Sequence, residues 1–469
     1  AYADDIILLA DNVETAQRLL NASTRFFEDR GLDINPAKCE SLVMRTLPSK
    51  KKVFTVTTPQ FYVKAEPIKP IEVGKAFKYL GQQFTCTGST NCSTKDLSEQ
   101  LLRIKKAPLK PQQKINIIKT YLMPAYIHSM QNPAVNKKIL REVDRKIRMV
   151  VKGILHLPLH LSNTAIYAPA KMGGLGMFSF SRKIPIIVLK RLNNLSRTCS
   201  NFHLVLREAA PWVNRLKKMV RPDVTTKEQV DRANGVEHEG SYYGGGTMQC
   251  RNDSASNTWI NTPPRYWTGS DYVKAVQLRL NCLATRGLPY NPPEQRRCRA
   301  GCDRVESLSH VLQKCPLGHT MRMRRHNYIV KRLKTMALKK GWTVEEEPIC
   351  DARGVLRKPD LILSNEETAL VVDAMVSWEC PRDLAETFDC KRLVYDQPEF
   401  TSVLESKYHP RNIRVLPFII GARGMWCRQS TETLEAMKVN NVSNRRELVH
   451  TTLRGSWSIH REFTRRSWE

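Results

Sequence analysis

The apolar positions of the first 45 residues predict a hairpin, a helix and a strand. Residues 6–10 form an apolar run after an Ala-Asp-Asp turn. Asn12 can cap a helix whose apolar residues recur at helical spacing, and Gly31 ends it. Strands are expected further along, at residues 41–44 and 77–84.

The pattern becomes helical from about Thr94. Pro111 opens one expected helix. Pro133 precedes a second helix, in which Leu140 and Ile147 lie on one apolar face.

The stretch from about Asp223 to Thr262 loses periodicity and gathers Gly, Ser and Asn, with three consecutive glycines at 244–246. Such composition is typical of a linker or a long loop. Residues 287–293 form a second, short boundary. A Cys/His cluster, a basic helix over about residues 320–340 and a mixed α/β segment follow, and the chain has no internal repeat.

Composition narrows the class of protein. The chain has 469 residues, enough for roughly three domains, and 41% of them are hydrophobic, which suffices for packed cores. Its 75 Lys and Arg against 45 Asp and Glu give a net charge of +30. Because such an excess concentrates phosphate polyanions at the surface, nucleic acid is a better expectation than a basic protein without such a partner.

The cysteines and the ends of the chain give less information about the class of protein. Thirteen cysteines, mostly isolated in sequence, favour a reducing compartment over a disulfide framework. No apolar run approaches the roughly 18 residues of a membrane span. The chain does not begin with Met, so a targeting signal is not readable from it.

The first constellation with chemical potential is Tyr2-Ala3-Asp4-Asp5. Adjacent acids at a tight turn between apolar strands place carboxylates at an exposed tip, where Asp4 and Asp5 can hold Mg²⁺. Metals held there can activate a 3′-hydroxyl and stabilise a leaving pyrophosphate. Asp-Asp is also ordinary turn chemistry, but the helix and strands that follow favour a polymerase palm.

The second constellation is Cys298, Cys302, His310 and Cys315. Three thiolates and one imidazole at this spacing match the ligands of a closed, tetrahedral Zn²⁺ site. Buried cysteines with a capping histidine are the alternative, and His319 could replace His310 as the fourth ligand. A closed site of this kind folds and positions the chain and does not catalyse.

The third constellation begins at Asp360. If a hairpin is centred between Glu366 and Glu367, Asp360 and Asp373 fall opposite each other. Opposed residues have Cβ atoms about 4.5–5.5 Å apart, close enough for both carboxylates to hold one Mg²⁺. Their mutual repulsion without a cation also favours a metal. Two solvated acids on a hairpin are the alternative.

A helix expected further along adds a basic group. Leu384, Phe388 and Tyr395 share one face of it, and Lys391 interrupts that apolar face. If the face covers the hairpin, Lys391 can orient an attacking water or steady a phosphate. A lysine that snorkels to solvent is the alternative. Glu379, just past the second strand, is a further candidate ligand.

The basic helix lies between the Cys/His cluster and these acids, which favours a track for the DNA backbone. A charge run is otherwise a solvated helix face. The candidate contacts are Arg322, Arg324, Arg325, Lys331, Arg332 and Lys334.

With these sites in this order, the chain resembles the C-terminal part of a non-LTR retrotransposon protein. More narrowly, it resembles the restriction-like-endonuclease group, in the R-two-like, ribosomal-DNA-inserting clade. The resemblance covers essentially the whole chain. The strings that carry it are Tyr2-Ala3-Asp4-Asp5, Gly31-Leu32 through Cys39, Tyr79-Leu80-Gly81, the Cys-Cys-His-Cys knuckle, and Lys358-Pro359-Asp360 with Asp373.

This resemblance implies a multidomain α+β protein. A partial polymerase palm is expected over residues 1–88, a helical thumb and connector over 89–222, a linker region over 223–290 and a small zinc knuckle over 291–319. Residues 320–469 are expected to hold the basic helix and an α/β restriction-like endonuclease of the PD-D/E-K type.

The reaction that the resemblance implies is target-primed reverse transcription. The endonuclease cuts chromosomal DNA, and the freed 3′-hydroxyl primes copying of element RNA. Asp4 and Asp5 match a metal-binding pair of the palm, and Asp360 and Asp373 match the endonuclease acids, which gives two Mg²⁺ sites and one structural Zn²⁺. The implied partners are target genomic DNA such as ribosomal DNA, element RNA and, for the full-length parent, dNTPs, in the nucleus and without a membrane.

Two departures from the family pattern matter. Restriction-type nucleases usually place a Lys two residues after the second acid, where this chain has Met375, so Lys391 is the candidate replacement. The first palm aspartate and the fingers are not in this chain, which alone is not expected to polymerise. The rival hypothesis is a non-catalytic, zinc-containing nucleic-acid-binding protein derived from a decayed element.

Overall fold

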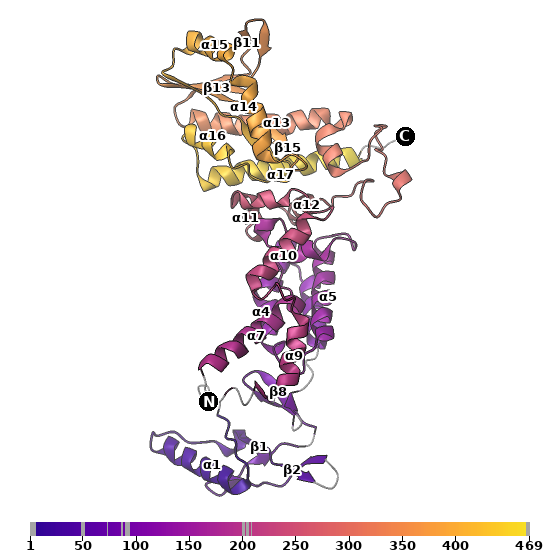
Figure 1. Ribbon diagram of the computed structural model, residues 1–469, viewed down its shortest axis with the longest axis vertical. Helices are drawn as coiled ribbons and strands as arrows, with labels where there is room; N and C mark the ends of the chain where they lie inside the picture. Colours follow the sequence, from indigo (N-terminus) through magenta and orange to yellow (C-terminus); the bar gives the residue numbers. More distant parts are fainter. Residues whose placement is uncertain are drawn as a thin grey trace. The chain divides into compact units, whose positions relative to one another are not determined.

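The computed structural model divides into two compact units. Figure 1 labels its helices and strands. The first unit comprises Ala1–Asp96, Pro124–Glu142 and Val188–Lys217, and the second comprises Leu97–Met123, Val143–Ile187 and Lys218–Glu469. The structure describes residues 6–47, 52–72, 74–85, 88–89, 94–198, 202, 206–207 and 209–465. Within these ranges no helix combines the length and apolar character needed to cross a membrane.

The helix predicted to begin after Asn12 is confirmed as α1 (Val13–Glu28). The Asn12 side chain accepts a hydrogen bond from the Thr15 backbone N–H at 2.8 Å, which satisfies one of the unpaired donors of the first turn. Leu20 of this helix is buried with Val63 and Ile68, so its apolar stripe builds the small core of the first unit.

The strands of the first unit are short. They pair as β1 (Glu40–Ser41) with β6 (Lys69–Pro70), β2 (Met44–Leu47) with β3 (Lys52–Thr55), β4 (Tyr62–Val63) with β5 (Glu66–Pro67), and β7 (Phe77–Tyr79) with β8 (Gln82–Thr85) and β9 (Gly88–Ser89), with a short helix η1 at Pro36–Lys38.

One predicted strand is wrong: residues 77–84 form the hairpin β7–β8. Leu80 and Gly81 have φ of +46° and +75°, and two consecutive positive φ values turn the chain tightly back on itself. The turn was not predicted because Tyr79-Leu80-Gly81 is largely apolar, as a strand would be.

The helical region predicted from Thr94 is confirmed. Its elements are α2 (Lys95–Lys106), α3 (Pro111–Ile117), η3 (Ile118–Leu122), α4 (Met123–Ser129), α5 (Lys137–Ile154), α6 (Asn163–Tyr167), η4 (Ala170–Met172), α7 (Phe180–Thr198) and α9 (Ala210–Met219). Pro111 is the first residue of α3, as expected of a proline at a helix start. Leu140 and Ile147 of α5 are buried, so the apolar face read from their spacing is correct.

The linker predicted over 223–290 is wrong. The segment holds α10 (Lys227–Glu239), η5 (Thr247–Arg251), α11 (Ala255–Asn261) and α12 (Gly269–Arg279). Trp259, Trp267 and Tyr272 are buried there as a cluster of aromatic rings. A Cβ at Gly244 would overlap the His238 carbonyl oxygen, so this glycine serves close packing and not flexibility.

The C-terminal segment is built on mixed β-pairing. Four strands form one sheet in the order β10 (Thr343–Glu346), β13 (Leu361–Ser364), β14 (Thr368–Val372) and β16 (Asn412–Val415), in which only the last pair is parallel. Beyond them, β15 (Ala374–Ser377) pairs in parallel with β17 (Phe418–Gly421), and β11 (Cys350–Ala352) forms a hairpin with β12 (Val355–Arg357).

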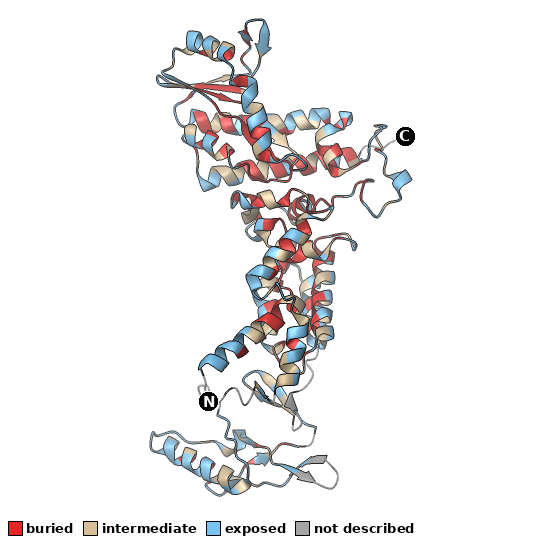
Figure 2. Cartoon of the chain, in the orientation of Figure 1, coloured by how far each residue is buried: buried red, intermediate tan, exposed pale blue. Residues whose placement is uncertain are grey.

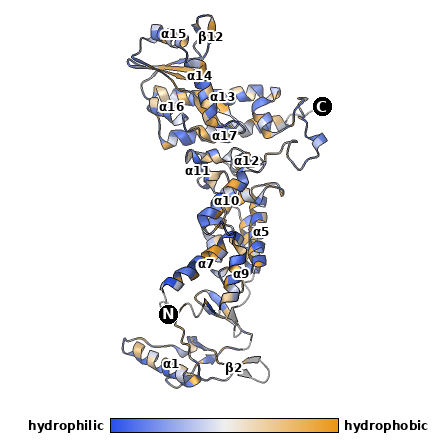
Figure 3. Cartoon of the chain, in the orientation of Figure 1, coloured by the Kyte–Doolittle hydropathy of each residue, from blue (hydrophilic) through white to orange (hydrophobic). Residues whose placement is uncertain are grey.

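The helices of this segment are η6 (Pro293–Gln295), η7 (His310–Lys314), η8 (Pro316–Gly318), α13 (His319–Leu338), α14 (Leu384–Tyr395), α15 (Pro398–Tyr408), α16 (Ser430–Ala436) and α17 (Val442–Arg465). The last five, from α13 to α17, contact the strands. Ile362 and Val371 of the sheet share a core with Tyr395 of α14 and Phe400 of α15. Helix α13 contacts β10, β13 and β15 and packs along α17. The central strands β13 and β14 are largely buried (Figure 2) and hydrophobic (Figure 3).

Candidate functional site

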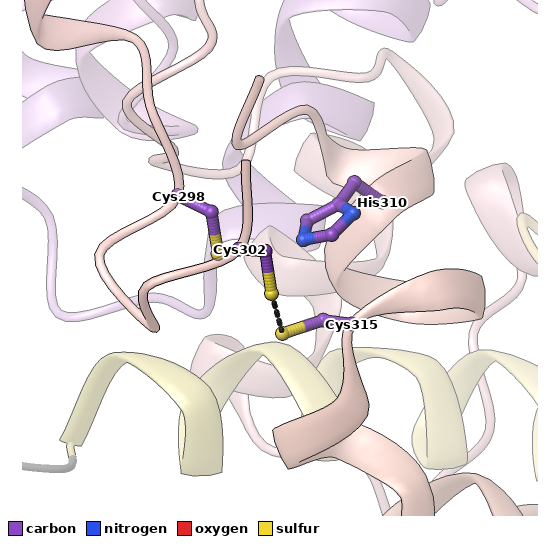
Figure 4. A group of neighbouring side chains, drawn as sticks. All are labelled: Cys298, Cys302, His310 and Cys315. Carbon is purple, nitrogen blue, oxygen red and sulfur yellow. Dashed lines mark hydrogen bonds between the residues drawn. The ribbon is translucent and has the colours of Figure 1, made fainter. Parts of the chain in front are cut away.

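The structure brings together the four residues predicted to bind zinc. Cys298, Cys302, His310 and Cys315 point toward one another (Figure 4), and their ligand atoms lie within 4.8 Å of one another. His319 is not part of this group, which resolves the choice between the two histidines in favour of His310.

Local backbone structure explains this convergence. The Cys298 N–H donates to the Arg304 carbonyl at 2.9 Å, so the first two cysteines lie on a tight loop. Gly301 in that loop has a φ of +77°, a conformation that favours glycine. His310 begins η7, and Cys315 follows it directly, so one helical turn sets their separation.

Two observations test whether a zinc ion fits. The Cys302 and Cys315 sulfurs lie 3.8 Å apart, far longer than a disulfide of about 2.05 Å. Zn–S bonds of about 2.3 Å in a tetrahedron give a sulfur–sulfur separation of about 3.8 Å. Both ring nitrogens of His310 are buried without a hydrogen-bond partner within the described ranges. The cluster could therefore hold a metal ion, in agreement with Zn²⁺.

The pKa values of these side chains also bear on metal binding. Burial raises the pKa of the Cys298 thiol to about 12, and burial lowers the pKa of His310, which keeps its imidazole neutral. A neutral imidazole is the form that binds a metal, and a cation would reverse the thiol shift by stabilising thiolates.

The predicted acid pair also meets as the hairpin register requires. Leu361 pairs with Val372, and Ile362 pairs with Val371, which is the register of a hairpin centred between Glu366 and Glu367. Asp360 and Asp373, the next residues at the open end, therefore face each other.

The two carboxylates interact strongly. Burial, together with the charge of Asp360, raises the pKa of Asp373 to about 6. A carboxyl with a raised pKa beside a second acid is typical of functional sites, and a divalent cation would relieve the repulsion.

Lys391 reaches this pair from α14. Its Nζ lies 2.5 Å from Asp373 Oδ2, and the two side chains are 31% and 7% exposed. Leu384, Phe388 and Tyr395 of the same helix are buried, so the predicted interruption of an apolar face is confirmed. Position 375, where the family pattern has its lysine, is an exposed methionine in β15.

His326, which the sequence pattern did not predict, also contacts the acid pair. Its Nε2 lies 2.9 Å from Asp360 Oδ1. The pKa of His326 is raised, and its hydrogen bond with the Asp360 side chain is the largest cause. His326 falls on the buried stripe of α13 that includes Ile329, Val330 and Leu333. The signal for it in the sequence is a histidine at helical spacing from these apolar residues, within a helix that is otherwise rich in basic residues.

The prediction that Glu379 is a metal ligand is wrong. It is fully buried, and its Oε2 forms an ion pair of 2.9 Å with Arg423 Nε. Its Oε1 accepts a hydrogen bond of 2.7 Å from the Arg423 backbone N–H. This carboxylate is therefore committed to a structural ion pair, away from solvent.

The six residues of α13 that were predicted to contact DNA differ in how far they are buried. Arg325 is wrong as a DNA contact, because it is buried and donates to Ser456 Oγ at 2.9 Å. Arg322 is half-buried and donates to the Cys315 carbonyl at 2.6 Å. Arg332 pairs with Glu447 at 3.0 Å, and Lys334 pairs with Glu346.

The remaining two residues, Arg324 and Lys331, are exposed.

The predicted polymerase acids Asp4 and Asp5 lie outside the described residues.

The fold and these side chains define a mixed α/β protein with a knuckle-like Cys₃His cluster and a separate acid–lysine cluster. No family model matches the chain. It is 37% identical over 472 residues to a retrovirus-related Pol polyprotein from type-1 retrotransposable element R2 of Popillia japonica, covering 100% of this chain and 98% of the relative. A second such polyprotein from the same species is 37% identical over 478 residues, covering all of this chain and 77% of the relative.

A third relative is the Pol polyprotein from type-2 retrotransposable element R2DM of Drosophila melanogaster. It is 30% identical over 475 residues, which are 99% of this chain and 44% of the relative. The chain therefore belongs to the Pol polyproteins of R2 elements, a group of non-LTR retrotransposons. The predicted family is confirmed.

Proposed function

We propose that this chain carries a Mg²⁺-dependent DNA endonuclease at Asp360, Asp373 and Lys391. The observation that carries the proposal is the approach of the Lys391 ammonium to within 2.5 Å of Asp373 Oδ2, beside a second acid on the facing strand. A net charge of +30 suits a polyphosphate substrate.

Asp360 and Asp373 would hold the magnesium ion, since carboxylate oxygens are the ligands it prefers. A bound magnesium ion supplies Lewis acidity toward the scissile phosphate and lowers the pKa of a bound water. Lys391 then orients the attacking water or stabilises the negative charge that develops on the phosphate. Its ion pair with Asp373 fixes the ammonium where that charge arises.

The wider proposal follows the family. The Cys₃His cluster holds one structural Zn²⁺ within a knuckle over residues 291–319, and residues 320–469 form the restriction-like endonuclease. Residues 1–88 form the C-terminal part of a reverse transcriptase palm, in which Asp4 and Asp5 are Mg²⁺ ligands. Residues 89–222 form its helical thumb and connector.

In the parent polyprotein the nick made in target DNA, such as ribosomal DNA, primes copying of element RNA from dNTPs, which implies action in the nucleus.

The test is nicking of supercoiled plasmid by the full chain with Mg²⁺. Wild type and the matched control Glu367→Gln, an exposed acid at the tip of the same hairpin, are expected to nick. Asp360→Ala and Asp373→Ala are expected to lose nicking. Equal nicking by all four proteins would contradict the assignment of the endonuclease site. DNA binding without any cleavage would favour a non-catalytic zinc-containing nucleic-acid-binding protein.

A further inference from the structure

His326 contacts the proposed nuclease site from a different helix than Lys391 does. It lies on α13, and its Nε2 is 2.9 Å from Asp360 Oδ1. The other oxygen of Asp360, Oδ2, accepts a hydrogen bond of 2.6 Å from the Ala374 backbone N–H. Each oxygen of this carboxylate thus has one donor, one from a helix and one from the neighbouring strand.

The helix that carries His326 is firmly fixed. Arg325, its neighbour, is buried and donates to Ser456 Oγ of α17 and to the Leu312 carbonyl. Ile329, one turn further along, is 1% exposed. Because the backbone around position 326 is held in this way, the imidazole has little freedom to follow a mobile carboxylate and instead sets its direction.

We propose that His326 is a positioning residue that orients Asp360 for divalent-cation binding. A carboxylate offers about four lone-pair directions, so two remain for a cation after the two hydrogen bonds are made. With the plane of the Asp360 carboxylate set by His326 and Ala374, those two directions are set as well. This inference rests on the proposed nuclease function and adds a residue that the family motif does not contain.

The expected effect follows from known metal sites. Removal of a hydrogen-bonding partner of a metal ligand weakens metal affinity by about 10- to 100-fold. His326→Ala should therefore weaken cation binding by at least about 10-fold, whereas the maximal nicking rate at saturating Mg²⁺ should change much less. In His326→Gln the side-chain amide nitrogen can replace Nε2 as the donor, so this variant should stay near wild type. Asn is too short to do so.

The direct test measures binding of Mn²⁺ to the zinc-loaded full chain by electron paramagnetic resonance, without DNA. Asp360→Ala defines the background, because it removes the site. The proposal expects weak binding by His326→Ala and His326→Asn and near-normal binding by His326→Gln. If the alanine variant does not fold, the Gln and Asn pair decides.

Wild-type Mn²⁺ affinity in all three His326 variants would overturn the proposal. That outcome is distinguishable from failure of the nuclease assignment itself. In the first case Asp360→Ala still loses nicking while the His326 variants keep their cation affinity; in the second case Asp360→Ala nicks plasmid as well as wild type does.

Discussion

At the scale of the residue, the same side-chain type serves different purposes according to what it packs against. Glu379 and Asp373 are both buried acids, but one is matched by Arg423 and the other lies beside a second acid and Lys391. Sequence position alone suggested both as metal ligands. The partner, contributed by a distant segment, decides which acid is structural.

Glu379→Gln should lower the free energy of unfolding by about 3 kcal/mol or more, because it leaves the Arg423 guanidinium buried without its counter-charge. Urea denaturation of the zinc-loaded chain measures this change. Glu367→Gln, at an exposed position, is the control and should leave stability within about 0.5 kcal/mol of wild type. A Glu379 variant as stable as this control would refute the structural assignment.

Arg324 and Arg325 are adjacent in sequence, yet we expect opposite behaviour from them. Arg324→Gln should reduce the dependence of DNA affinity on salt by about one unit of log–log slope, as one lost phosphate contact would. Arg325→Gln should leave the slope unchanged and lower stability, since its guanidinium is buried. Affinity titrations at several salt concentrations test the pair, and a flatter slope for Arg325→Gln alone would contradict the arrangement.

At the scale of the element, the Cys₃His cluster is joined to α13 and α17. Arg322 of α13 donates to the Cys315 carbonyl, and Phe463 of α17 packs against Cys298 and Cys315. Metal bound here would therefore order the start of α13, which carries His326.

Cys298→Ser should lose about one zinc per chain and unfold at a lower temperature, because binding energy at a structural zinc site is folding energy. Elemental analysis by mass spectrometry and a thermal melt provide the two measurements. Cys390→Ser is the matched control at an exposed cysteine and should keep both zinc and stability. A folded Cys298→Ser protein with full zinc content would exclude the cluster as the site.

Helix α17 should make the protein sensitive to acid. Burial lowers the pKa of both His450 and His460 to about 4, against about 6.5 for an unfolded histidine. Between these values the unfolded chain binds protons that the folded chain does not. The stability of the neutral form is thus fully present above about pH 6.5 and is lost as the pH falls toward 4.

Denaturation of His460→Gln across this range should show a smaller loss of stability with acid than wild type shows. Since acid also protonates the zinc ligands, the comparison is between the slopes of the two proteins and not their absolute stabilities. Identical slopes would mean that His460 is not the acid-sensitive group.

At the scale of the whole molecule, local patterns predicted the parts that local rules control. Helical spacing identified α1, α5 and α14, and the polar turn after Ser364 fixed the register that brings Asp360 opposite Asp373. The Cys₃His cluster was predictable because its four members lie close in sequence.

Tertiary contacts determined what the sequence did not reveal. The glycines at 244–246 have the composition of a linker, but backbone atoms pack closely against two of them: those of His238 against Gly244 and those of the distant Glu379 against Gly246. A flexible segment and a tightly packed one therefore look alike in sequence. His326 lies 34 positions from Asp360, and no periodicity connects two residues that meet only when a helix packs beside a strand.

The central claim is that residues from a hairpin and a following helix form one nuclease site. The most direct measurement is the single-turnover rate of plasmid nicking at saturating Mg²⁺ for Asp373→Asn and Lys391→Met. Lys407→Met, an exposed lysine paired with Glu345, is the control. We expect losses of at least about 100-fold for the first two variants and a wild-type rate for the third. Wild-type nicking by both Asp373→Asn and Lys391→Met would contradict the central claim.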